Sequence, residues 1–177
     1  ILFVNALFHP FKGGVENHML ELGKQLVKKG VQVHVLTAQL KGTKAEENIG
    51  GIKVHRIPCI EVKLPFLYPP PVILAQHVYK EIEKLDKKFN FDVINLEDRW
   101  YPDFNNALWY ARINRKPFVV TIHNARPVGI APQYTLFGGA YDLFIGRWVF
   151  KSADKLIAVS KWVISDIAKY GVSEKKI

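Results

Sequence analysis

Cysteine is nearly absent from the sequence, since Cys59 is the only one among 177 residues. A single cysteine excludes a disulfide within the chain, which favours a reduced, cytoplasmic setting. Long apolar runs are absent too, because none approaches the roughly 18–20 residues that a helix needs to span a bilayer. The chain opens on Ile1–Val4 without an initiator methionine, a basic flank or a signal-peptide cleavage site. We expect this opening to be a buried strand.

Short motifs of several catalytic and binding classes are also absent. The sequence has no D-x-D, no H-x-x-x-H and no cysteine cluster, so it predicts no metal site. It has neither the P-loop pattern nor the G-x-S-x-G elbow of many hydrolases. No third glycine follows Gly13-Gly14, and the second predicted strand ends Thr37-Ala38-Gln39, without an acid to hold a ribose. A dinucleotide-binding fingerprint is therefore excluded, and no cofactor is expected.

Positive charge is in excess, with 25 Lys and Arg residues against 16 Asp and Glu residues and a formal net charge of +9. Such a balance attracts anions but does not fix a fold. The lysines are scattered rather than gathered in one stripe, and no nucleic-acid-binding module accompanies them. We therefore expect solvated helix surfaces and no nucleic-acid partner. Peripheral contact with the inner face of an anionic membrane, through the basic surface and Leu64–Pro71, is a weaker alternative.

Apolar runs of strand length alternate with segments of helical period. The predicted strands are rich in Val, Ile, Leu and Phe, as in strands covered on both faces; they are Ile1–Leu7, Gln32–Ala38, Ile52–Ile57, Asp92–Asp98, Phe118–Asn124 and Lys155–Ser160. Helices are predicted at Val15–Lys29, Val72–Phe89, Asp103–Ile113, within Tyr141–Lys151, and after Ser160, a predicted N-cap. Lys41–Gly51 is predicted to be a polar loop, and the proline-rich Leu64–Pro71 an extended connection. This alternation predicts one α/β domain with a doubly wound, mostly parallel sheet and helices on both faces.

A diglycine turn lies where the first predicted strand leads into the first helix. In an open α/β sheet, ligands bind beyond the carboxyl ends of the strands. Gly13 and Gly14 let backbone N–H groups approach a ligand closely, and a helix start favours an anion such as phosphate. A turn that needs glycine only for its shape explains the same residues. The spacing alone does not decide between these readings.

Three polar side chains lie at the carboxyl ends of later predicted strands. His123 ends the strand Phe118–Asn124, where it can donate or accept a hydrogen bond near neutral pH, or can serve as a structural histidine. Glu97 and Asp98 end their own strand, where they can bind sugar hydroxyls or act as a base. A helix-start charge or a partner for Arg99 is the simpler explanation for the two acids, and the sequence slightly favours it.

Five segments, taken together and in order, resemble the motifs of a known family. They are Phe8-His9-Pro10 with Gly13–Glu16, the Gly30–Val35 run into the second strand, the T-x-H-[DN] segment within Phe118–Asn124, the A-D-x-x-I-x-V-S segment Ala153–Ser160, and the G-V-x-x-x-K-I segment Gly171–Ile177. These motifs resemble those of the family-4 retaining glycosyltransferases, also called glycosyl transferase group 1. The resemblance covers nearly the whole chain.

The resemblance implies a GT-B fold, in which two Rossmann-like domains face a cleft. Residues 1–177 would be the N-terminal, acceptor-side domain, and the C-terminal nucleotide-sugar domain would lie outside this chain. The implied activity is transfer of a sugar from a nucleotide-sugar to a sugar or lipid-linked acceptor, with retention and without a metal. This chain alone is then expected to be inactive. A non-enzymatic Rossmann-like module that binds a sugar or a nucleotide is the alternative.

The resemblance also assigns roles to particular residues. The Gly13 and Gly14 amides would reach the donor diphosphate, and His123 would bond the transferred sugar near the reacting carbon. Glu97, Asp98 and Asn124 are acceptor-side candidates. The sequence departs from the family here, because Asn95-Leu96-Glu97-Asp98 stands where many members carry histidine.

Overall fold

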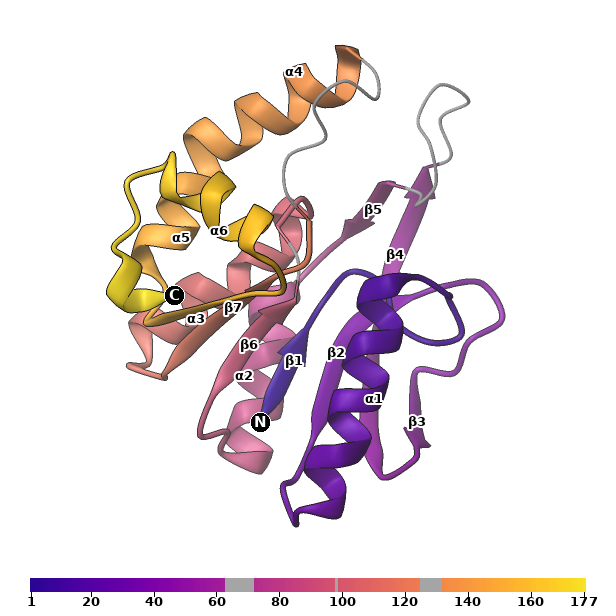
Figure 1. Ribbon diagram of the computed structural model, residues 1–177. Coiled ribbons are helices and arrows are strands. Elements are labelled where there is room, and N and C mark those ends of the chain that lie inside the picture. Colours follow the sequence, from indigo (N-terminus) through magenta and orange to yellow (C-terminus); the bar gives the residue numbers. More distant parts are fainter. Residues whose placement is uncertain (63–71, 98, 125–131) are drawn as a thin grey trace.

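The computed structural model describes residues 1–62, 72–97, 99–124 and 132–177. An eight-stranded sheet lies at its centre, with helices on both faces (Figure 1). The strands are β1 (Leu2–Val4), β2 (His34–Gln39), β3 (Glu46–Ile49), β4 (Ile52–Val62), β5 (Val72–Ala75), β6 (Ile94–Glu97), β7 (Phe118–Ile122) and β8 (Lys155–Ala158). The predicted connection Leu64–Pro71 lies outside the described residues.

The helices follow the strands in the alternating order that the sequence predicts. They are α1 (Gly14–Lys28), α2 (Val78–Phe89), α3 (Asn106–Ile113), α4 (Pro132–Tyr141), α5 (Arg147–Ser152) and α6 (Lys161–Ala168). Short 3-10 turns, η1 (Pro102–Asn105) and η3 (Glu174–Lys176), precede α3 and end the chain. One π-helical stretch, η2 (Asp142–Gly146), joins α4 to α5.

The sheet has the strand order β3-β4-β2-β1-β6-β7-β8, with β5 paired to β4 off this path. Neighbours from β4 to β8 are parallel, whereas β3 and β5 pair with β4 in the antiparallel direction. Counted along the chain, the parallel strands are arranged third, second, first, fourth, fifth and sixth, which is the order of a Rossmann fold. The predicted α/β, Rossmann-like, mostly parallel architecture is confirmed.

Two cores lie on opposite faces of the sheet, because successive side chains of a strand point to opposite sides. Phe3 of β1 packs with Met19 of α1 in the smaller core. Leu2 of the same strand packs in the larger core with Ile82 of α2 and Leu108 of α3. Helix α1 therefore covers one face, while α2 and α3 cover the other (Figure 1).

The predicted helix Val72–Phe89 is wrong over its first part, which forms β5 instead. In β5, Ile73 and Ala75 are buried and Leu74 between them is exposed, which is the period of a strand. His77 then takes a left-handed conformation, with φ 63°, immediately before α2. Antiparallel pairing with β4 determines the structure here, because tertiary contacts override helix propensity in a short apolar run.

The predicted loop Lys41–Gly51 is also corrected, because it contains β3. Gly50 and Gly51 have φ values of 60° and 89°, and they join Ile49 to Ile52, which face each other in the ladder. Two consecutive residues with positive φ form the tight hairpin turn whose twist matches that of the flanking strands. Glycine is required at both positions, and β3 becomes an edge strand of the sheet.

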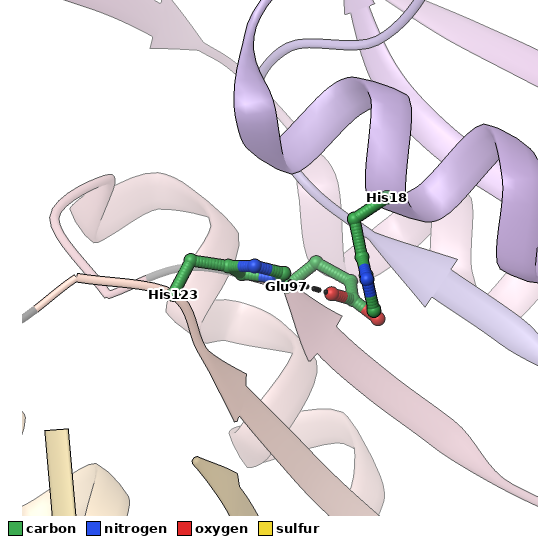
Figure 2. Close-up of side chains that lie close together, drawn as sticks. All are labelled: His18, Glu97 and His123. Carbon is green, nitrogen blue, oxygen red and sulfur yellow. Dashed lines mark hydrogen bonds and ion pairs between the residues drawn. The ribbon is translucent and has the colours of Figure 1, made fainter. Parts of the chain in front are cut away.

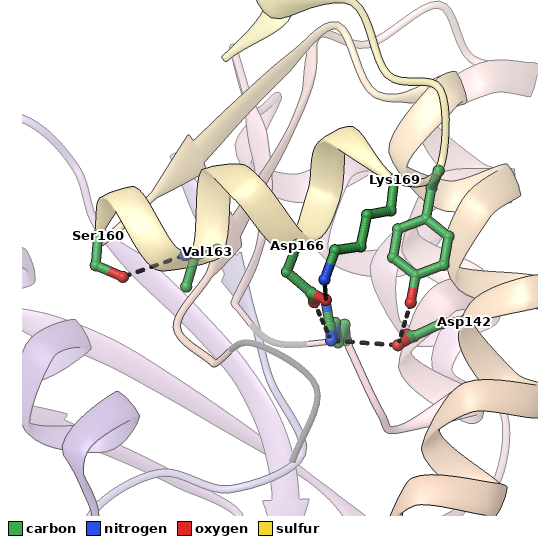
Figure 3. A network of polar contacts seen from close by, with 7 residues as sticks. Asp142, Ser160, Val163, Asp166 and Lys169 are labelled. Carbon is green, nitrogen blue, oxygen red and sulfur yellow. Dashed lines mark hydrogen bonds and ion pairs between the residues drawn. The ribbon is translucent and has the colours of Figure 1, made fainter. Parts of the chain in front are cut away.

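The predicted helix within Tyr141–Lys151 is part of a longer helical stretch that runs through α4, η2 and α5. Gly138 and Gly139 lower the helix propensity of α4, so the sequence pattern did not indicate it. The predicted N-cap is confirmed, since the Ser160 hydroxyl oxygen accepts a hydrogen bond from the Val163 amide at 3.3 Å (Figure 3).

A buried ionic network joins the segment after β6 to the helices at the carboxyl-terminal end (Figure 3). The Arg99 guanidinium donates to the Asp166 carboxylate of α6 at 2.9 Å and lies 3.2 Å from the Asp142 carboxylate of η2. The Tyr170 hydroxyl donates to Asp142 at 3.1 Å. Burial raises the pKa of Asp142, and the charge of Arg99 opposes that rise. The two carboxylates therefore share one buried cation.

A second buried polar pair consists of two histidines on β2 and β4. His34 Nδ1 lies 3.0 Å from His55 Nε2, and the two rings stack. Phe89 and Phe91 also contact the His34 ring. Burial, followed by the charge of His55, lowers the pKa of His34 to about 4 from its ordinary value of 6.5. Burial also lowers the pKa of His55.

This pair is expected to make the fold sensitive to mild acid. Because the folded state binds fewer protons than the unfolded state between pH 6.5 and pH 4, stability should fall as the pH is lowered through that window. Scanning calorimetry between pH 7 and pH 5 should show a falling Tm. His34→Asn, which removes the titrating ring, should flatten the slope, whereas His77→Asn on the surface should not. A wild-type Tm that is constant across this range would contradict the prediction.

Candidate functional site

The site lies where the direction of the strand order changes. β1 pairs with β2 on one side and with β6 on the other. The chain first builds the sheet outward from β1 through β2 to β4, and then returns to add β6, β7 and β8 on the opposite side of β1. Connections leaving neighbouring strands at such a point diverge, and they leave a crevice beyond the carboxyl ends of the strands. The first turns of α1 and the ends of β6 and β7 come together here, since the His18 ring of α1 lies 4.9 Å from the ring of His123, which follows β7.

Glu97 and His123 form a direct contact at the ends of β6 and β7 (Figure 2). Glu97 Oε2 lies 2.8 Å from His123 Nε2, the Glu97 side chain is fully buried, and that of His123 is nearly so. An ionised carboxylate can only accept, so Nε2 carries the proton in this pair and Nδ1 of a neutral ring is left as an acceptor. The pair thus presents an oriented imidazole at the crevice.

Asn95 and Thr121 hold the Glu97 carboxylate in place through hydrogen bonds. Asn95 donates through Nδ2 to Glu97 Oε1 at 2.6 Å, and the Thr121 hydroxyl donates to Asn95 Oδ1 at 3.2 Å. Period two places Asn95 and Glu97 on one face of β6, and it places Thr121 and His123 on the matching face of β7. Both oxygens of the Glu97 carboxylate are therefore bonded, which fixes the carboxylate and through it the ring of His123.

His18 of α1 completes the cluster from the other side of the crevice. Its ring centre lies 4.9 Å from that of His123, in an edge-to-face arrangement, and the side chain is exposed (Figure 2). The sequence analysis missed His18, because no motif points to it. Its spacing of four residues from Gly14 is the available signal, since such residues share one side of a helix.

The two glycines at the start of α1 differ in what they contact. A Cβ on Gly13 would lie 2.2 Å from Glu16 Oε2, the end of a buried side chain that folds back over the turn, so a larger residue there would have to displace that carboxylate. A Cβ on Gly14 would meet nothing within 4 Å, and Gly14 is not among the residues with positive φ. Neither packing nor backbone conformation therefore requires glycine at position 14.

The loop between β1 and α1 is held firmly by its neighbours. The Thr37 hydroxyl donates to the Ala6 carbonyl at 3.0 Å, and Asn5 donates to the Leu7 carbonyl at 2.8 Å. Arg56 of β4 donates to the His9 carbonyl at 2.6 Å. The backbone that leads to Gly13 is thus anchored on β2 and β4, which gives the helix start a fixed position relative to the strand ends.

Two further residues, Asn124 and Asp98, were predicted to belong to the site. Asn124 follows His123 and is exposed at the same edge of the sheet. Asp98 lies outside the described residues. The simpler explanation for the acids, a pairing with Arg99, does not describe Glu97, whose carboxylate contacts His123 and Asn95.

A separate cavity of about 420 Å³ lies beside β4, β5 and the start of α2. Its lining is mostly apolar and includes Cys59, His77 and Glu81, none of which belongs to the crevice cluster. Burial raises the pKa of the Cys59 thiol. A thiol of raised pKa is a poor nucleophile, so this cavity carries no sign of cysteine chemistry.

With this geometry established, comparison with known sequences identifies the family. The sequence profile of Glycosyltransferase Family 4 matches residues 12–177. The chain belongs to this family. The resemblance noted from the five motifs is thereby confirmed, and the Rossmann-like domain is that of an N-terminal half of a GT-B glycosyltransferase.

One related sequence is an uncharacterized glycosyltransferase of Methanocaldococcus jannaschii, which is 27% identical over 182 residues. The match covers 100% of this family-4 chain and 46% of the relative. The chain therefore spans about half the length of that curated relative.

Two solved structures share the fold of this family-4 domain. A sucrose-phosphate synthase from Thermosynechococcus elongatus has a TM-score of 0.61 at 14% identity, over 98% of this chain and 83% of that one. Anabaena HepE, solved in complex with UDP-glucose, has a TM-score of 0.60 at 16% identity, over 99% of this chain and 41% of that one. Among the described residues, no helix is both long enough and apolar enough to cross a membrane.

Proposed function

We propose that this chain is the acceptor-side half of a glycosyltransferase that moves a sugar from a nucleotide-sugar to an acceptor hydroxyl, with retention of configuration and without a metal. Family membership supports the reaction class, and the HepE complex with UDP-glucose supports a nucleotide-sugar as donor. The acceptor is a sugar or a lipid-linked molecule, and the donor domain is a second Rossmann-like unit.

The observation that carries the proposal is the contact between Glu97 and His123 at the strand-order switch point, beside the open start of α1. The carboxylate orients the ring and holds the proton on Nε2, so that Nδ1 can accept a hydrogen bond from a hydroxyl of the transferred sugar. Glu97 acts here as a positioning residue. Polar groups fixed before the reaction stabilise developing charge without reorganising.

The helix start would act on the leaving group. As the bond between sugar and diphosphate breaks, negative charge develops on the diphosphate, and the positive end of the α1 dipole with its first amides stabilises that charge. The Glu16 carboxylate folded over Gly13 disfavours an anion directly above that residue. We therefore place the diphosphate over Gly14, where the structure has open space.

A donor screen on the protein that contains this chain together with its donor domain tests the proposal. Release of a nucleoside diphosphate from one nucleotide-sugar, dependent on an acceptor and retained in EDTA, is the expected result. Product NMR should show the anomeric configuration of the donor. Saturable binding of nucleotide-sugars without any transfer would instead support the non-enzymatic binding module, and loss of activity in EDTA would overturn metal independence.

Gly14→Val provides a site-directed test of the diphosphate position. The new side chain meets no protein atom near its Cβ, so the Tm should stay within a few degrees of wild type. Because the methyl groups fill the space assigned to the diphosphate, turnover should fall by roughly 100-fold or more, the scale expected when one preorganised stabilising contact is lost. Gly14→Ala should show a smaller effect. Unchanged turnover in a normally folded Gly14→Val protein would remove the helix start from the site.

A further inference from the structure

The cluster at the crevice also has the composition of a metal site. His18, Glu97 and His123 each offer one ligand atom, and these atoms all lie within 4.8 Å of one another. Two imidazoles and one carboxylate are a ligand set used for zinc and other divalent transition metals. The three residues come from α1, β6 and β7, so no short sequence motif could reveal them.

The distances fit an ion after a small adjustment. Ligand atoms about 2.1 Å from a tetrahedral ion are roughly 3.4 Å apart. Glu97 Oε2 and His123 Nε2, now 2.8 Å apart, need to separate slightly. The third ligand atom needs to approach, and it belongs to His18, which is exposed on a helix and so is free to change rotamer. Most of the movement therefore falls on the least constrained residue.

The hydrogen bonds and the burial of Glu97 also support a metal site. The Asn95 amide holds Glu97 Oε1, and Thr121 in turn holds Asn95, so the carboxylate is already oriented. Metal-binding carboxylates are commonly fixed by such outer hydrogen bonds. Glu97 is fully buried, unlike the exposed acidic groups that gather on surfaces without an ion. Three protein ligands leave one coordination position open towards the crevice.

We propose that His18, Glu97 and His123 bind one divalent transition-metal ion of the zinc class. Binding replaces the hydrogen bond between His123 and Glu97, since Nε2 must lose its proton before it can coordinate. The metal-bound state and the hydrogen-bonded state are therefore mutually exclusive. This inference does not depend on the proposed reaction, because transfer without a metal belongs to the state in which the hydrogen bond between His123 and Glu97 is intact.

Titration of the chain with Zn²⁺ and with Co²⁺, without any sugar, tests the site. Calorimetry should find one saturable Zn²⁺ site per chain, and bound Co²⁺ should show visible absorption of low-coordinate geometry. His18→Ala should weaken Zn²⁺ binding about 10-fold or more, since loss of a direct ligand should matter at least as much as loss of an outer partner. This variant should fold normally, because alanine suits an exposed helix position.

His77→Asn is the matched control, since His77 is exposed, has a left-handed backbone that asparagine tolerates, and lies outside the cluster. It should bind Zn²⁺ as wild type does. Mg²⁺ should not compete, because it prefers a shell of oxygen ligands. Equal Zn²⁺ affinity in His18→Ala and wild type, or no saturable site in wild type, would overturn the proposal whatever the protein does with nucleotide-sugars.

Discussion

His123→Ala, made in the proposed two-domain glycosyltransferase, is expected to lower kcat about 100- to 1,000-fold. That is the usual effect of removing one preorganised polar group from a stabilising site. The physical reason is the fixed orientation of the ring: both Glu97 oxygens are bonded, and one of them holds His123 Nε2 at 2.8 Å. In the proposed mechanism, alanine leaves the sugar hydroxyl without its hydrogen-bond partner, and water takes that place.

Steady-state kinetics and thermal unfolding together check this prediction. The Tm of His123→Ala should fall, because the buried Glu97 carboxylate loses one of its hydrogen-bond partners, so kinetics are compared at a temperature where both proteins are folded. His77→Asn should retain full turnover. Glu97→Gln should show a smaller loss than His123→Ala, since the amide keeps a neutral hydrogen-bond partner for the ring. Kinetics of His123→Ala that match wild type would exclude His123 from the site.

Arg99→Met is expected to be strongly destabilising, with a loss of about 3–5 kcal/mol in the free energy of unfolding. Methionine fills much of the volume but leaves the Asp142 and Asp166 carboxylates buried without their shared cation. Burial already raises the pKa of Asp142 even with Arg99 beside it. The loss should therefore be smaller at pH 5 than at pH 7, because protonation of Asp142, whose pKa is raised, removes a buried charge.

Denaturant unfolding at both pH values measures this effect. Lys169→Ala is the control, because Lys169 also approaches Asp166 but at 3.9 Å and with a side chain that is 65% exposed. Its removal should change stability by about 0.5 kcal/mol or less, as is usual for a solvent-screened pair. A loss below about 1 kcal/mol in Arg99→Met would show that the network contributes little to stability.

The strands β3 and β5 were not predicted from the sequence, and pairing with β4 explains why both segments form strands. Ile49-Gly50-Gly51-Ile52 carries a hairpin signal, a diglycine between apolar residues, and β3 follows from it. Val72–Ala75 is too short for its residue pattern to distinguish a strand from a helix. Pairing with β4 decides it, because the backbone groups of a strand need a neighbour.

The sequence predicted only part of the candidate site. Because parallel strands all end at one edge, the positions of Glu97 and His123 at strand ends predict that they share a rim. Their contact, and the support from Asn95, depend on the register between β6 and β7. His18 joins them only because α1 crosses above the same face of the sheet.

The sequence by itself determined the alternation of strands and helices, the family motifs and the strand ends that carry polar residues, because periodicity and local chemistry are properties of neighbouring residues. Tertiary structure alone decided three things. It paired Glu97 with His123, it placed Arg99 beside Asp142 and Asp166, and it brought the Glu16 carboxylate over Gly13 while leaving open space at Gly14. Each of these is a contact between elements, and such contacts are fixed by strand register and helix placement rather than by sequence spacing.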